Sequence, residues 1–133
     1  MTDNIKEISM KINSGRFKYR KLEIPESARP TTEKVREAVF SMLMGRVEGA
    51  TVLDLFAGSG SLGLEALSRG AEYCVFNEGD RKNYKILRNN IENCKAEEIS
   101  SSYNNDFRKT LVLANRKFDI IFIDPPYREG YYG

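Results

Sequence analysis

Four residues near the end of the chain, Asp124-Pro125-Pro126-Tyr127, have the types needed to hold a planar amino group for reaction. They follow the apolar run "KFDIIFI", so we expect them at the carboxyl end of a buried strand. Two prolines remove two backbone donors, which leaves the Asp124 carboxylate and the Pro125 carbonyl as acceptors for one exocyclic amino group. Holding its hydrogens turns the nitrogen lone pair towards an electrophile, and Tyr127 offers a ring on which an unstacked base can lie. The alternative is a turn that only ends the strand.

A glycine-rich stretch, "LDLFAGSGSLG", contains the pattern G-x-G-x-x-G between Gly58 and Gly63. Between a strand and a helix, this pattern is typical of dinucleotide binding, but glycines also serve tight turns. A dinucleotide would place its pyrophosphate at the N-terminus of the following helix. Asp54, four residues before Gly58, would repel that group. A cationic ligand without phosphate fits better, and S-adenosylmethionine is such a ligand.

Acidic residues also follow the next two expected strands. Glu78 ends the run "AEYCVFNEG" and suits the two hydroxyls of a ribose, whether in NAD or in S-adenosylmethionine. Asp80 could serve instead, or could cap the next helix. Asp106 follows the third expected strand, in "ISSSYNNDF", and could accept a hydrogen bond from an adenine amino group. Alternatively, it caps a helix or belongs to a turn.

Cations and aromatic residues alternate in "GRFKYRK", Gly15 to Lys21. On a strand, Arg16, Lys18 and Arg20 would share one face. Such interleaving suits a nucleic-acid surface, with phosphates on the cations and bases on the rings. A solvated edge strand with protective charges is the alternative.

The elements that must position these residues alternate along the chain. We expect strand-like pieces near residues 6–12 and 16–23, and a turn-rich linker up to Pro30. The expected helices cover 31–45, 61–68 and 80–96, with a short helix or loop over 108–117. The expected strands cover 50–58, 71–79, 99–107 and 117–127. Strand–helix alternation at this spacing predicts a parallel sheet, whose carboxyl ends bring the four motifs together at one edge.

Composition narrows the classes further. The sequence has no histidine, and Cys74 and Cys94 belong to no C-x-x-C pair, so a zinc site and a histidine-based triad are not expected. We interpret both cysteines as buried free thiols. No run of 18 apolar residues predicts a membrane span, and the N-terminus lacks an apolar signal segment, so we expect a cytoplasmic protein without metal.

In this order, "DLFAGSGSLGLEALSRGA", "VFNEGD", "NND" and "DPPY" resemble the class I S-adenosylmethionine-dependent methyltransferases that modify exocyclic amino groups. The segment "SGRFKYRKLEIPESARPTTEKVREAVFSML" is similar to the RsmD-type family, which methylates N2 of a guanine in 16S ribosomal RNA. The resemblance runs from about Lys11 to Tyr127. It is most specific in Arg29-Pro30-Thr31-Thr32, in Val35-Arg36-Glu37 and in the glycine loop.

The resemblance implies an α/β fold, a Rossmann-like parallel sheet with helices on both faces. It also implies a small basic β extension over residues 1–30 that faces RNA, and a methyltransferase domain over residues 31–133. The family continues beyond "DPPY" with a helix and three more strands. We therefore expect about four of seven strands, a truncated chain, and an unprotected edge at the fourth strand. The implied partner is ribosomal RNA or the small ribosomal subunit. We expect the protein to be a monomer.

Residue roles carried over from the family fall into three groups. The implied catalytic residues are Asp124, Pro125, Pro126 and Tyr127. The implied cofactor-binding residues are Asp54, Phe56, Gly58, Gly60, Glu78, Asp106 and Phe107. The implied RNA-facing residues are Arg16, Lys18, Arg20, Arg29, Thr31, Thr32 and Arg36. Asn105 stands where the family often has glycine.

Three other functions remain open at this point. "DPPY" also serves DNA adenine-N6 methyltransferases, although 133 residues leave no room for a separate target-recognition domain. A fragment could bind cofactor or RNA without turnover. A nicotinamide dehydrogenase is disfavoured by Asp54.

Overall fold

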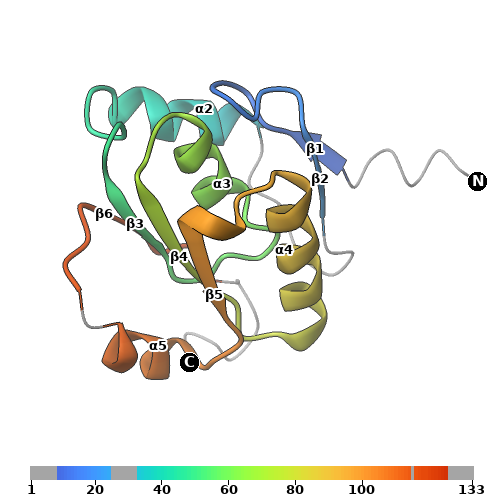
Figure 1. Cartoon of the computed structure of the whole chain (residues 1–133), viewed down its shortest axis with the longest axis vertical. Coiled ribbons are helices and arrows are strands. Elements are labelled where there is room, and N and C mark those ends of the chain that lie inside the picture. Colours follow the sequence, from blue (N-terminus) through green and yellow to red (C-terminus); the bar gives the residue numbers. More distant parts are fainter. Residues whose placement is uncertain (1–8, 25–32, 115, 126–133) are drawn as a thin grey trace, which may run out of the picture.

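The computed structural model describes residues 9–24, 33–114 and 116–125, which form two sheets and the helices around them (Figure 1). The strands are β1 (Ser9–Lys11), β2 (Lys21–Glu23), β3 (Thr51–Asp54), β4 (Tyr73–Asn77), β5 (Ser100–Tyr103) and β6 (Ile120–Phe122). The helices are α2 (Glu33–Met42), α3 (Ser61–Ser68), α4 (Arg81–Asn93), the 3-10 turn η1 (Glu97–Ile99) and α5 (Phe107–Leu113).

The larger sheet has four parallel strands in the order β5-β4-β3-β6. Val52 of β3 lies opposite Cys74 of β4 and Ile120 of β6. Continuous apolar runs suit strands that are covered on both faces, and Val52 and Leu53 are both buried. The expected α/β parallel sheet is confirmed.

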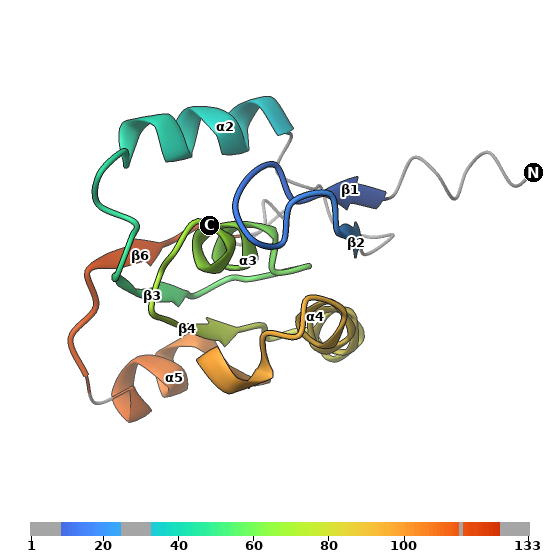
Figure 2. The ribbon, with the colours of Figure 1, turned by 45° about the horizontal axis from the view of Figure 1, so that its top comes forward.

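Helices cover both faces of this sheet (Figure 2). Successive side chains of β3 point to opposite faces, so Val52 joins one core and Leu53 the other. The larger core packs α2, α3 and α4 against the sheet, and the smaller core packs Phe107 of α5 against it. The predicted helices on both faces are therefore confirmed.

The small sheet is an antiparallel hairpin of β1 and β2 that packs into the larger core through Ile12, Phe17 and Leu22. The expected strand over 16–23 is wrong for its first half, because the chain turns there. Tyr19 has a positive φ of 73°, and its amide donates to the Ile12 carbonyl to close the turn. The expected domain boundary after residue 30 lies outside the described residues.

β6 is an edge of the larger sheet as far as the structure describes it. Ile121 and Ile123 are 49% and 65% exposed, as expected for an apolar strand without a further neighbour. Within the described segments, every helix is too short or too polar to cross a lipid bilayer.

Candidate active site

The carboxyl ends of the four parallel strands carry most of the residues predicted to do chemistry. β3 ends at Asp54, and Glu78 directly follows β4. Asp106 lies three residues after β5, and Asp124 lies two residues after β6. Because the strands are parallel, these four acidic positions occupy the same edge of the sheet.

Asp54 is buried, and its Oδ2 accepts a hydrogen bond of 3.0 Å from the Gly63 amide. Burial raises the pKa of this carboxyl to about 7, against the lowering effect of that hydrogen bond. The charges of Asp124 and Glu78 raise the pKa further. Two carboxylates therefore act on a third, buried one here, and the arrangement favours a cationic ligand.

Glu78 ties the glycine loop to the end of β4. Its Oε1 accepts from the Gly58 amide at 2.8 Å, and its Oε2 accepts from the Asp80 amide at 2.9 Å. Asp80 caps α4 by accepting from the Asn83 amide, so of the two roles expected for it the structure shows the cap. Each Glu78 oxygen keeps a lone pair for a further donor.

Two glycines of the loop are required by close packing. Gly60 has a φ of +88°, and a Cβ there would lie 2.6 Å from Cδ1 of Leu87. A Cβ on Gly63 would lie 2.3 Å from the Phe76 ring. A Cβ on Gly58 would meet nothing within 4 Å, so open space adjoins the loop at this point.

The rings of Phe56 and Phe107 lie beside each other, with centroids 5.0 Å apart. Asp106 precedes Phe107 and caps α5, and its carboxylate also forms a two-pronged ion pair with Arg108. The hydrogen bonds from Arg108 lower the pKa of Asp106 to about 2. The structure thus shows the capping role; an adenine contact stays a prediction.

Asn77 is a site residue that sequence reasoning missed. It is buried at the end of β4, and its Nδ2 donates to the Asn105 carbonyl at 3.0 Å and to the Leu55 carbonyl at 3.4 Å. Its Oδ1 accepts from the Thr110 hydroxyl and from the Asn105 amide. Asn77, at the end of β4, therefore contacts the residues that follow β3 and β5 and also contacts α5 through Thr110. The available signal was a polar residue ending an apolar strand run.

The predicted catalytic loop is described as far as Pro125. Asp124 is exposed and Pro125 is half-buried. The charge of Asp124 reaches the buried Asp54, which places it at the same edge. Pro126 and Tyr127 lie outside the described residues.

The cations of the hairpin turn, Arg16, Lys18 and Arg20, are exposed as predicted but lie on a turn rather than a strand. The Arg16 amide donates to Ser68 at the end of α3, and the Arg20 guanidinium donates to the Asn93 carbonyl at the end of α4. Both helices run back from the carboxyl edge. The turn therefore lies at the opposite end of the molecule (Figure 1).

Arg36 does not face RNA, and that prediction is wrong. Its side chain is buried, donates to the Lys11 carbonyl and lies 3.8 Å from the Glu65 carboxylate. Glu65 is also buried and accepts from the amides of Asn13 and Ser14. Arg36 thus fixes α2 to α3 and to the hairpin. Three further predicted RNA-facing residues lie outside the described residues: Arg29, Thr31 and Thr32.

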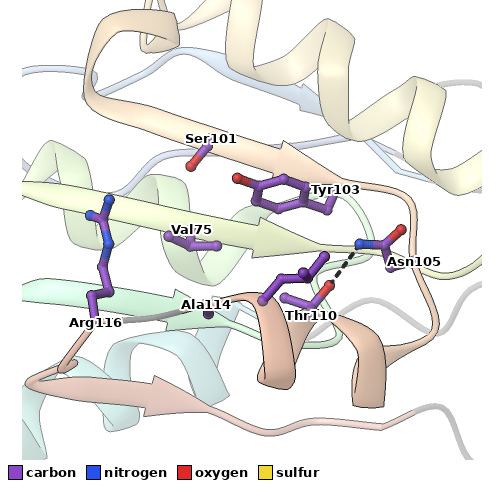
Figure 3. Close-up of a pocket in the computed structure, with 8 residues that line it drawn as sticks. Val75, Ser101, Tyr103, Asn105, Thr110, Ala114 and Arg116 are labelled. Carbon is purple, nitrogen blue, oxygen red and sulfur yellow. Dashed lines mark hydrogen bonds between the residues drawn. The ribbon is translucent and has the colours of Figure 1, made fainter.

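A cavity of about 270 Å³ lies between α5 and the sheet (Figure 3). Five residues contribute its polar groups: Ser101, Tyr103, Asn105, Thr110 and Arg116. None of the predicted site residues lines it, and only Asn105 belongs to the segment that follows β5 at the carboxyl edge. The cavity is therefore not the place where the predicted chemistry converges.

Cys74 and Cys94 are buried free thiols, as expected. Burial raises the pKa of Cys94 to about 11 and raises that of Cys74 well above its ordinary value, so both stay protonated and unreactive. Among the described residues, acidic and cysteine side chains form no cluster arranged to hold a metal ion.

Comparisons with known proteins point to one family. The family described as "Conserved hypothetical protein 95" matches residues 10–132. The "Putative rRNA methyltransferase YlbH" of Bacillus subtilis is 42% identical over 125 residues, covering 90% of this chain and 68% of the relative. "Ribosomal RNA small subunit methyltransferase D" of Escherichia coli is 40% identical over 123 residues, covering 91% of this chain and 62% of the relative.

A solved structure shares the fold closely. The "Putative methyltransferase yhhF" from Escherichia coli has a TM-score of 0.82 and 39% identity, with 92% of this chain and 67% of that chain covered. The chain thus spans about two thirds of the length of these relatives. Since the family match extends over nearly all of the sequence, the chain belongs to the Conserved hypothetical protein 95 family, the RsmD-type methyltransferases.

Proposed function

We propose that this protein transfers a methyl group from S-adenosylmethionine to the N2 amino group of a guanine in small-subunit ribosomal RNA. The observation that carries the proposal is the meeting of Asp54, Glu78 and Asp124 at one edge of the sheet, where two of the charges raise the pKa of the third. A sulfonium and an ammonium group would relieve this repulsion, whereas a pyrophosphate would increase it. The names of the relatives support ribosomal RNA as the substrate class.

The residues present fit the cofactor. Asp54 and the backbone at Gly58 and Gly60 would hold its methionine end, since open space adjoins Gly58. Glu78 would bind the ribose hydroxyls with the lone pairs that its two backbone hydrogen bonds leave free. The adenine would lie near Phe56, which follows β3, and Phe107, which begins α5; their rings lie beside each other, and Asp106 directly precedes Phe107.

When bound, the cofactor supplies a methyl group made electrophilic by its sulfonium. The Asp124 carboxylate and the Pro125 carbonyl would hold the two hydrogens of the guanine amino group, and Tyr127 would stack against the base. Held in this way, the nitrogen would direct its lone pair at that methyl carbon, and the electron pair of the broken carbon–sulfur bond would remain on the sulfur. The proton that nitrogen loses passes to Asp124, which is exposed and can release it to water.

The RNA would contact the protein in two regions. Arg29, Thr31 and Thr32 belong to the segment between β2 and α2. The hairpin turn carries Arg16, Lys18 and Arg20 and contacts the C-terminal end of α3. It is separated from the carboxyl edge of the sheet by the length of this 8-residue helix, about 12 Å. Contacts there would be to phosphates distant from the target base, which suits a large folded RNA in the cytoplasm.

The proposal is tested by incubating the chain with purified small ribosomal subunits and methyl-labelled S-adenosylmethionine. We expect label in ribosomal RNA, and digestion should yield N2-methylguanosine. Label in added duplex DNA, with none in the RNA, would indicate an adenine-N6 enzyme instead. An Asp124→Ala variant serves as the control for contaminating activity.

A second candidate function is binding of cofactor or RNA without turnover. It is favoured by the exposed edge of the sheet at β6, the strand that precedes the proposed catalytic loop. Ile121 of β6 and Ile123, just after it, are both exposed there. In that case calorimetry detects S-adenosylmethionine binding while no methyl group reaches any nucleic acid. Measured transfer by this chain excludes it.

A further inference from the structure

Asn90, in the last turn of α4, has a buried side chain with three hydrogen bonds to backbone groups. Its Oδ1 accepts from the Glu23 amide at 2.8 Å, and its Nδ2 donates to the Glu23 carbonyl at 2.8 Å. The same Nδ2 donates to the Ser59 carbonyl at 2.8 Å. The orientation of the amide is unambiguous, since two carbonyls require the donor end and one N–H requires the acceptor end.

These contacts join two segments that have different proposed tasks. Glu23 is the last residue of β2 and directly precedes the segment that carries Arg29. Ser59 lies in the glycine loop, between Gly58 and Gly60. Asn90 therefore links the N-terminal hairpin to the loop that approaches the cofactor.

The link holds the loop in a specific conformation. The Ser59–Gly60 peptide is fixed at both ends, because its carbonyl accepts from Asn90 and its N–H donates to the Ala57 carbonyl at 2.8 Å. Gly58 and Gly60 lie on either side of Ser59, and because glycine has no Cβ the backbone there can rotate more freely than at other residues. Without the Asn90 amide, this peptide would lose the side chain that sets its direction.

We propose that Asn90 is a positioning residue that couples the hairpin to the cofactor loop. Binding of S-adenosylmethionine at the loop then stabilises the end of β2. In turn, the contact between Glu23 of the hairpin and Asn90 strengthens cofactor binding. If the cofactor stabilises the end of β2 in this way, thermodynamic linkage requires the hairpin contact to strengthen cofactor binding by the same factor. The inference rests on the proposed function, because it takes S-adenosylmethionine as the ligand of the loop.

The first test compares two variants of the whole chain by calorimetry with S-adenosylmethionine. Asn90→Asp keeps an acceptor for the Glu23 amide but turns a carboxylate oxygen towards two carbonyls. Asn89→Asp makes the same change at the neighbouring exposed position of α4. We expect Asn90→Asp to raise the Kd about 5- to 150-fold, the usual range for coupled sites, and Asn89→Asp to leave it unchanged.

The second test uses hydrogen exchange, first on the wild type and then on the Asn90→Asp variant. On adding the cofactor, the Glu23 amide should gain more protection than the Arg16 amide, which belongs to the same hairpin but is held by Ser68. In folded Asn90→Asp this difference should vanish, which a general loss of stability would not produce. Equal affinities of the two variants, or equal protection of the two amides in the wild type, overturns the coupling. Failure of the wild-type chain to bind the cofactor overturns the proposed function instead.

Discussion

The Asp54 carboxylate accepts its hydrogen bond from Gly63, an amide in the first turn of α3. This contact connects the end of β3 to the helix on the far side of the glycine loop. It also keeps the carboxylate buried beside the charges of Glu78 and Asp124. The contact between Asp54 and Gly63 thus helps to shape the loop. It also holds a buried carboxyl group whose ionised form is unfavourable unless a cationic ligand is bound.

Cofactor affinity should therefore depend on pH near neutrality. The pKa of Asp54 is raised to about 7, so below that pH the free site carries a proton that a cationic ligand must displace. We expect the affinity for S-adenosylmethionine to rise up to about tenfold per unit between pH 5 and 7 and to level off above. Calorimetry across this range measures it. The Asp54→Asn variant has no carboxyl proton to lose at this position, so its weaker binding should be independent of pH.

The same carboxyl should affect folding in the opposite sense. Because its pKa is higher in the folded chain than the ordinary 3.8, the folded state holds more protons between pH 4 and 7. Without cofactor, its contribution to stability is present below pH 4 and is lost as pH rises towards 7. Urea unfolding of the wild type and of Asp54→Asn should show this extra loss in the wild type alone. Parallel pH profiles for the two proteins would contradict the raised pKa.

Asp124→Ala should slow methyl transfer strongly and spare cofactor binding. Asp124 is exposed after β6, and its proposed partner is the amino group rather than the buried loop. Loss of one preorganised acceptor should lower the single-turnover rate about 100- to 1000-fold, with a Kd for S-adenosylmethionine within a few-fold of wild type. Glu72→Gln, an exposed change before β4, is the control. Equal loss of binding and of rate would assign Asp124 to the cofactor.

The order of strands and helices is predictable from the sequence because it follows from local patterns. A run such as "TVLD" or "YCVFN" is apolar and short, and glycine or a capping acid stands between it and the next helix. The convergence of Asp54, Glu78 and Asp124 then follows from parallel topology alone.

Arg36, Asn90 and the hairpin turn are not predictable in this way, because their partners lie far away in the chain. A charged residue on a helix is expected to face water, yet Arg36 is buried against Glu65, 29 residues later. An asparagine on a helix such as Asn90 is likewise expected to face water, and only the fold shows that it contacts Glu23 and Ser59. The alternating "RFKYR" pattern suits a strand, but packing on Ser68 forces a turn.

Glu65→Gln should destabilise the chain strongly. The variant removes the charge that faces the buried Arg36 while keeping the shape of the side chain. Breaking one side of a buried ion pair typically costs about 3–5 kcal/mol in the free energy of unfolding. Urea unfolding measures the loss, and Glu92→Gln, an exposed change on α4, is the control that should stay within about 0.5 kcal/mol. Similar values for the two variants would mean that Arg36 is not held by Glu65.

Gly58 and Gly63 of the glycine loop should differ in their tolerance of alanine, and the order is set by space rather than by helix propensity. Gly63 lies inside α3, where alanine is ordinarily better by about 1 kcal/mol. Its Cβ would nevertheless lie 2.3 Å from the Phe76 ring and 2.8 Å from the Cys74 sulfur, both buried in the sheet. Overpacking typically costs about 1–3 kcal/mol, and a contact as short as 2.3 Å with a buried ring belongs at the upper end of that range, so the cost outweighs the helix-propensity gain and Gly63→Ala should be destabilising overall.

Gly58→Ala is the matched control for Gly63→Ala. It meets no neighbouring atom within 4 Å, and its only penalty is a φ of +58°, about 1 kcal/mol for an L residue. Thermal unfolding should therefore rank Gly63→Ala below Gly58→Ala, whereas S-adenosylmethionine titration should rank them the other way. The new methyl group of Gly58→Ala points into the open space assigned to the cofactor, and that of Gly63→Ala points into the core. A Gly58→Ala variant that binds as tightly as wild type would move the cofactor away from this loop.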